Sequence, residues 1–152
     1  YPAGWKEMKT GADQPSYQFY KGAHAISEAE TKALVRFTRS LKPVISAAYH
    51  STGREIFWHY QTSGQQKERD YRLAKAVADK TGYHLSQPAK NAVGSGFTDW
   101  LIAEFKIPAM TIEIGKERVN TEVPLREFEA EWKANRDIGW LLLKEALDSG
   151  QK

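Results

Sequence analysis

Hydrophobic and polar positions along the chain follow two periods, and each period predicts a different kind of element. Apolar residues at helical spacing predict helices over residues 27–41, 65–82, 98–105 and 124–147. Continuous apolar runs predict strands at 43–50 and 109–115, and shorter strands are expected at 54–60 and, on a sheet edge, at 83–88. This alternation indicates an α/β fold with a mainly parallel or mixed sheet flanked by helices.

The helix ends and helix faces have signals of their own. Ser27 and Glu30 have capping-box spacing, Gly82 stands where the second helix should end, and Thr98 or Asp99 is expected to cap the third. The apolar spacing also predicts which side of each helix faces the core. The predicted core positions are Ala33, Leu34, Phe37 and Leu41 in the first helix, Tyr71, Ala74, Val77 and Ala78 in the second, and Phe128, Trp132, Ile138, Leu142 and Leu143 in the last.

Length and charge exclude several classes of function. The 152 residues correspond to a single domain, with a net charge of +3 and charges of both signs interspersed. There is no basic tract to bind nucleic acid and no apolar run long enough to span a membrane. The absence of cysteine excludes disulfides, a thiol nucleophile and a cysteine-ligated zinc site. Five dispersed tryptophans favour core packing over a sugar-binding platform.

Two strands end in residues capable of chemistry. His50 follows the run 43–49, and Glu113 lies in the otherwise apolar segment 109–115. Ligands in such sheets bind at the carboxyl ends of the strands, so both residues are candidates for a site. His50 is either a metal ligand or acid–base group, or a hydrogen-bonded residue at a strand end. Glu113 is either a general base or half of a buried salt bridge.

Four segments resemble the zinc carboxypeptidase family, in particular its bacterial branch of γ-D-glutamyl-diamino-acid endopeptidases. They are "YPAGW" at 1–5, "YKGAHAISEAETKAL" at 20–34, "ISAAYHSTGREIFW" at 45–58 and "GSGFTDWLIAEFKIPAMTIEIG" at 94–115. They follow the order of the family and extend over nearly the whole chain. The resemblance implies a zinc-dependent peptidase, and the bacterial branch implies peptidoglycan peptides as its substrates.

The resemblance also implies a role for four residues. His50 matches the third zinc ligand of the family, and Ser51 matches the adjacent residue that lines the substrate cleft. Glu113 matches the catalytic glutamate, which takes a proton from water and passes it to the leaving amine. Thr98 matches a position at the base of the pocket for the residue after the cut. A neutral threonine there argues against a pocket built around one strong charge.

Three departures from the family pattern are evident. The chain has no H-x-x-E motif, which supplies the family's first two zinc ligands, and the Asn-Arg pair expected before Tyr1 is not in it. The family's mobile cleft tyrosine aligns with Asn91. We therefore expect residues 1–152 to be a single incomplete domain, the C-terminal half of a catalytic domain, without peptidase activity in isolation. One zinc ion is expected in the complete domain, whereas this chain supplies too few of the family's ligands to hold it tightly.

Other functions remain open at this stage. A related zinc deacylase or amidase would use the same scaffold, and a non-catalytic remnant would bind peptides or serve as a partner subunit. The expected partners are a peptide substrate and either the missing N-terminal half or a second copy, because an uncovered sheet edge favours association. The resemblance favours the cell wall or secretion over the cytoplasm.

Overall fold

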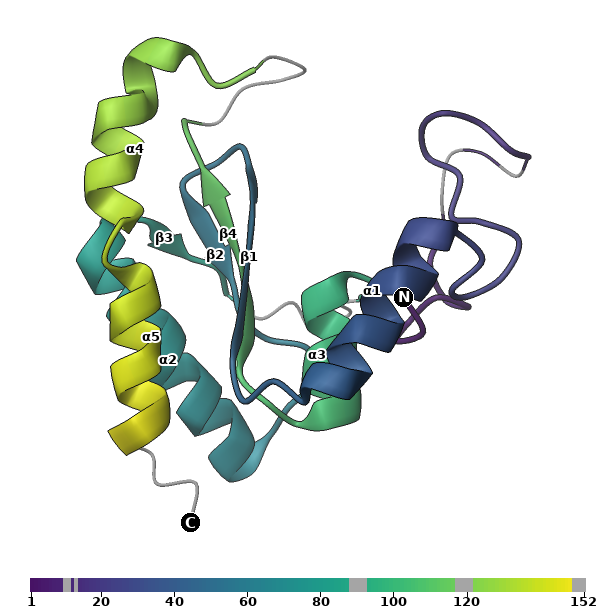
Figure 1. Ribbon diagram of the computed structural model, residues 1–152, viewed down its shortest axis with the longest axis horizontal. Coiled ribbons are helices and arrows are strands. Elements are labelled where there is room, and N and C mark those ends of the chain that lie inside the picture. The colour runs from purple at the N-terminus through teal and green to yellow at the C-terminus, as the bar shows by residue number, and fades with distance from the viewer. Residues whose placement is uncertain (10–11, 13, 88–92, 117–121, 149–152) are drawn as a thin grey trace.

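The computed structural model describes residues 1–9, 12, 14–87, 93–116 and 122–148. Its helices and strands follow the predicted order (Figure 1). They are α1 (Ala29–Leu41), β1 (Ser46–Ser51), β2 (Glu55–Phe57), α2 (Gly64–Thr81), β3 (His84–Leu85), α3 (Phe97–Phe105), β4 (Ala109–Ile114), the 3-10 helix η1 (Leu125–Glu127), α4 (Phe128–Asn135) and α5 (Ile138–Asp148).

The four strands form one mixed sheet in the order β1-β4-β2-β3. β1 and β4 are parallel, β2 and β3 are parallel, and β2 is antiparallel to β4. This arrangement confirms the predicted α/β fold with a sheet flanked by helices. β3 lies at an edge, as expected, and β1 is the other edge strand among the described residues.

The sheet separates two hydrophobic cores, because successive residues of a strand face opposite sides. Met110 and Ile112 of β4 pack with α2 and α5 on one face. Ala109 of the same strand packs with α3 and α1 on the other. Figure 1 shows α2, α4 and α5 together on one side, and α1 and α3 beside the part of the sheet where β1 and β4 begin. The carboxyl ends of β1 and β4 extend beyond α3.

Of the three predicted helix-end signals, one is confirmed and two need correction. Gly82 ends α2 in a left-handed conformation, as its sequence position predicted. The capping box at α1 was wrong, since the N-cap is Glu28 and the Ser27 hydroxyl donates to the Glu28 carboxylate instead. At α3 the N-cap is Gly96 and not Thr98 or Asp99. Asp99, three residues after the N-cap, accepts a hydrogen bond from the Gly96 amide.

The predicted core faces were correct for part of α2 and for part of the C-terminal segment. In α2, Ala74, Val77 and Ala78 are buried, while Tyr71 is 46% exposed. In the C-terminal segment, Ile138 and Leu142 are buried, but Phe128, Trp132 and Leu143 are exposed. The predicted single helix over 124–147 is also interrupted between Asn135 and Ile138. Because the helix is broken there, the apolar residues before and after the break do not form one continuous face.

The face of α1 was predicted wrongly. Leu34, Phe37 and Leu41 are 38%, 59% and 60% exposed, and the buried positions are Val35 and Thr38. The second half of β1 is exposed as well, with Tyr49 at 48%, although its apolar run predicted a strand covered on both faces. Both deviations lie on the β1 side of the molecule, where the described residues provide no further layer.

No helix in the described part of the chain combines the length and hydrophobicity that crossing a membrane requires.

Candidate active site

The carboxyl ends of β1 and β4 bring His50 and Glu113 together. The two strands are parallel and pair in register, with His50 opposite Glu113. Register partners point to the same face of a sheet, about 5 Å apart at their Cβ atoms. The two residues that the sequence placed at separate strand ends are therefore neighbours.

The same register extends across all four strands. Glu55 of β2 is the antiparallel partner of Glu113, and His84 of β3 is the parallel partner of Glu55. His50, Glu113, Glu55 and His84 thus form one row, the four-strand row, on the face of the sheet that α1 and α3 cover only in part. Sequence reasoning missed Glu55 and His84. Glu55 and Phe57 flank the buried Ile56. This alternation indicates which face of the strand Glu55 is on, but not which residue of another strand lies beside it.

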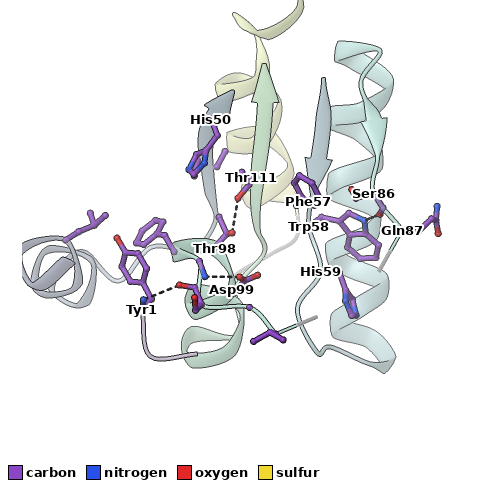
Figure 2. Close-up of a pocket in the computed structure, with 18 residues that line it drawn as sticks. Tyr1, His50, Phe57, Trp58, His59, Ser86, Gln87, Thr98, Asp99 and Thr111 are labelled. Carbon is purple, nitrogen blue, oxygen red and sulfur yellow. Dashed lines mark hydrogen bonds between the residues drawn. The ribbon is translucent and has the colours of Figure 1, made fainter. Parts of the chain in front are cut away.

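A cavity of about 890 Å³ lies on this face of the sheet. His50, Thr98, Thr111, Phe57 and Ser86 contribute to its wall (Figure 2). Aromatic rings and neutral hydroxyl groups make up much of its surface, and Asp99 is the carboxylate among its lining residues. A cavity of this size and polarity suits a small ligand or a few residues of a peptide.

Thr98 of α3 is one of the residues that line the cavity. Its hydroxyl is 3.0 Å from the Thr111 hydroxyl, and the side chain is buried. Figure 2 shows Thr111 on β4 between Thr98 and the more distant His50. Thr111 was not singled out from the sequence, although it lies two residues before Glu113 and on the same face of the strand. The two hydroxyls give this end of the cavity a neutral, hydrogen-bonding surface.

Ser51 is not brought to the cavity. It pairs in register with Ile114, so strand alternation places it on the opposite face from His50, and it is exposed. Its predicted role in substrate binding therefore has no support from the cavity lining. Asn91, which aligned with the family's cleft tyrosine, lies outside the described residues.

The electrostatic surroundings of Glu113 favour its protonated form. Partial burial raises its pKa above the ordinary glutamate value, His50 opposes that rise, and Glu55 adds to it. One carboxylate oxygen of Glu113 is buried and has no hydrogen-bond partner among the described residues. No Lys or Arg in the described part of the chain forms an ion pair with Glu113. A structural salt bridge therefore does not explain this carboxylate.

Asp99 has a structural role at the start of α3. It accepts a hydrogen bond from the Gly96 amide at 3.0 Å, while the amino group of Tyr1 donates to the Ser95 carbonyl at 3.1 Å. Burial raises the pKa of Asp99, and the Gly96 hydrogen bond opposes that rise. These contacts hold the 95–99 segment against the cavity.

The described residues match a zinc site only in part. A catalytic zinc ion normally has three protein ligands and one open position. No group of three His, Cys, Asp or Glu side chains in the described part of the chain is arranged to hold a metal ion. His50 is suited to be one ligand, and two further donors are needed.

Comparison with known proteins identifies a family. The family model for zinc carboxypeptidases, Peptidase M14, matches residues 1–138. Two curated bacterial proteins are similar in sequence. One is an uncharacterized protein, YqgT, of Bacillus subtilis (26% identical, covering 94% of this chain and 37% of that protein). The other is the gamma-D-glutamyl-L-diamino acid endopeptidase 1 of Lysinibacillus sphaericus (25% identical, 85% of this chain and 31% of that protein).

A solved structure has the same fold. The murein-tripeptide amidase MpaA from Escherichia coli O157 superposes with a TM-score of 0.56 at 19% identity, covering 88% of this chain and 49% of that one. The chain therefore spans about a third of the length of the two curated relatives and about half of the solved structure.

Proposed function

The chain belongs to the zinc carboxypeptidase family, and from this premise we propose that it forms part of the catalytic domain of a hydrolase that cleaves peptide bonds. The observation that supports this most directly is the in-register pairing of His50 with Glu113 beside the 890 Å³ cavity. To these two residues the family resemblance assigns zinc binding and proton transfer, respectively.

In this proposal Glu113 is the general base and acid. Its carboxylate takes a proton from the attacking water and delivers it to the leaving amine. A general base works best when its pKa lies near the working pH, and burial moves the pKa of Glu113 in that direction. One of its oxygens has no hydrogen-bond partner among the described residues, so no structural hydrogen bond occupies it.

The proposed zinc ion requires residues from outside the described part of the chain. His50 supplies one imidazole, and the described residues offer no complete ligand set. Because one imidazole does not hold zinc tightly, we propose that the other ligands come from a further segment of the same domain.

The open edge of β1 is where such a segment would join. β1 pairs with β4 on one side only, and Tyr49 of this strand and Leu34 and Phe37 of α1 are exposed apolar side chains. An unpaired strand edge beside exposed apolar residues is a surface for strand addition. We propose a strand from a further segment of the domain as its occupant, because the match covers only 49% of the solved relative.

The proposed substrates are peptides of the bacterial cell wall. This rests on the names of the two characterised relatives, an endopeptidase for γ-D-glutamyl-L-diamino acid bonds and a murein-tripeptide amidase. The neutral Thr98–Thr111 end of the cavity is compatible with a polar peptide segment. A cell-wall or secreted location follows from the same proposal.

The second candidate is a non-catalytic domain that binds peptides. It is favoured by the incomplete metal set of the described residues. A deacylase or amidase that uses the same residues on a different acyl group is a variant of the first proposal, and substrate profiling separates the two.

The test is Glu113→Gln in the full-length protein. The exchange preserves shape but removes proton transfer, so kcat for a γ-D-glutamyl-diamino-acid peptide should fall about 100- to 10,000-fold. Zinc content and thermal stability should stay at the wild-type values. Glu129→Gln, at an exposed position of α4, is the matched control and should retain full activity. If Glu113→Gln keeps its activity, or if the wild-type protein binds the peptide and never cleaves it, the catalytic proposal is wrong.

A further inference from the structure

Glu55 occupies a position in the four-strand row that the proposed chemistry does not use. It lies directly beside Glu113 on the neighbouring strand and beside His84 on its other side. Its carboxylate accepts a hydrogen bond from Ser86, and Ser86 lines the cavity. Glu55 is therefore attached to the wall of the cavity next to the proposed general base.

The turn after β1 places a glycine, and no side chain, against the Cβ atoms of Glu113 and Glu55. Gly53 crosses there, and a Cβ atom built on it would lie 3.7 Å from the Cβ atoms of both Glu113 and Glu55. Any side chain at position 53 would extend into the region between these two residues. With glycine in this position, no side chain of the turn stands between these two residues.

The register neighbours of these two carboxylates on their outer sides are histidines, His50 beside Glu113 and His84 beside Glu55. Neighbouring carboxylates in register repel each other. No Lys or Arg of the described residues forms an ion pair with Glu55. Arg54, the adjacent cation, is directed to Glu131 at 2.8 Å instead. A positive group on the substrate would relieve this repulsion, and a carboxylate held by a neutral hydroxyl is suited to receive it.

We propose that Glu55 is a specificity-determining residue that binds the second, protonated amino group of a diamino-acid substrate. The inference rests on the proposed function and specifies its substrate class. Glu113 acts on the scissile bond, and Glu55, one strand away, holds the ammonium group of the residue beside that bond. A diamino acid differs from an ordinary amino acid in this one group, so one carboxylate at this place distinguishes the two.

The test compares two peptides in the full-length protein. One is γ-D-glutamyl-diaminopimelate, and the other contains 2-aminopimelate, which lacks the second amino group. Wild-type protein should have a KM about 10- to 100-fold lower for the first peptide, the range expected for a charge-assisted hydrogen bond. Glu55→Gln should remove that difference by raising the KM of the diaminopimelate peptide, with kcat for the 2-aminopimelate peptide unchanged. Glu68→Gln, exposed on α2, is the matched control.

A binding titration with both peptides, monitored by NMR, keeps this inference separate from the proposed function. If the wild-type protein cleaves neither peptide, the proposed hydrolase activity fails, while a preference for the diaminopimelate peptide that Glu55→Gln abolishes still supports Glu55. Equal effects of Glu55→Gln on both peptides would overturn the inference. Loss of bound zinc in Glu55→Gln would also overturn it and assign the carboxylate to the metal site.

Discussion

At the scale of single residues, Glu131 of α4 shows how a buried carboxylate secures the edge of the sheet that contains the candidate site. It is 6% exposed and accepts hydrogen bonds from the Arg54 guanidinium, at 2.8 Å from Nε, and from the Tyr83 hydroxyl. Arg54 belongs to the turn after β1, and the Gly115 amide at the end of β4 also bonds to Glu131. One side chain thus joins the ends of the two strands that contain His50 and Glu113.

The protonation of Glu131 should make stability depend on pH. Burial alone raises its pKa, but the hydrogen bonds from Tyr83, Arg54 and Gly115 outweigh burial and hold the pKa below the ordinary value. A lowered folded-state pKa stabilises the fold above the unfolded-state pKa of about 4.3, and this contribution is lost as the pH falls through the folded-state value.

Glu131→Gln should therefore lower the free energy of unfolding by about 2 kcal/mol at pH 7, because charge-assisted hydrogen bonds become neutral ones. The difference from wild type should shrink as the pH falls below about 4. Urea unfolding at several pH values measures both effects. Glu129→Gln on the exposed face of the same helix should change neither. A deficit that is constant across the pH range would show that Glu131 acts through packing.

At the scale of elements, α1 has an apolar side that the rest of the described chain does not cover. Val35 is 3% exposed and packs against the α3 core, whereas Phe37, two residues later, is 59% exposed. A helix with apolar residues on both sides is typical of one that lies between two layers. The exposed apolar side of α1 is therefore a surface that another part of the domain would cover.

Two substitutions in α1 should separate its two sides. Val35→Ala should lower the free energy of unfolding by about 2 kcal/mol, because it leaves a cavity in the core. Phe37→Ser should change stability by less than about 0.5 kcal/mol and reduce self-association of the isolated chain, because it removes exposed apolar surface. Urea unfolding and sedimentation velocity measure the two effects. A large loss of stability in Phe37→Ser would mean that this side of α1 is already covered.

At the scale of the whole molecule, the open edge of β1 is the place where the proposed remainder of the domain would join. The Ser46 amide donates to the Pro108 carbonyl on the β4 side. Since amides alternate along a strand, those of Ala47, Tyr49 and Ser51 point to the open edge. Those three amides report directly on whether another strand is present.

Hydrogen exchange should therefore distinguish the chain alone from the full-length protein. In the 152-residue chain the amides of Ala47 and Tyr49 should exchange quickly, while Ala48 and His50, which point to β4, exchange slowly. In the full-length protein all four should be slow. Protection of Ala47 and Tyr49 that appears only at high concentration of the chain alone would indicate a second copy at this edge. Fast exchange in the full-length protein would contradict the proposed strand.

The sequence by itself determined what depends on neighbours in the chain. Helical spacing and a terminal glycine located α2 and its end at Gly82, and apolar runs located β1 and β4 with His50 and Glu113 at corresponding positions. Such signals are local, because a few consecutive residues fix the period and the turn. The family resemblance was read from segments of the same kind, and the family model confirms it.

Only the tertiary structure decided what depends on which strands pair. The row His50–Glu113–Glu55–His84 requires the order β1-β4-β2-β3 and one particular register, and nothing in the residues around Glu55 specifies either. The same holds for Thr111 beside Thr98 and for the exposed side of α1. Register and coverage arise from contacts between distant segments, so a chain read residue by residue gives the candidates for a site but not their arrangement.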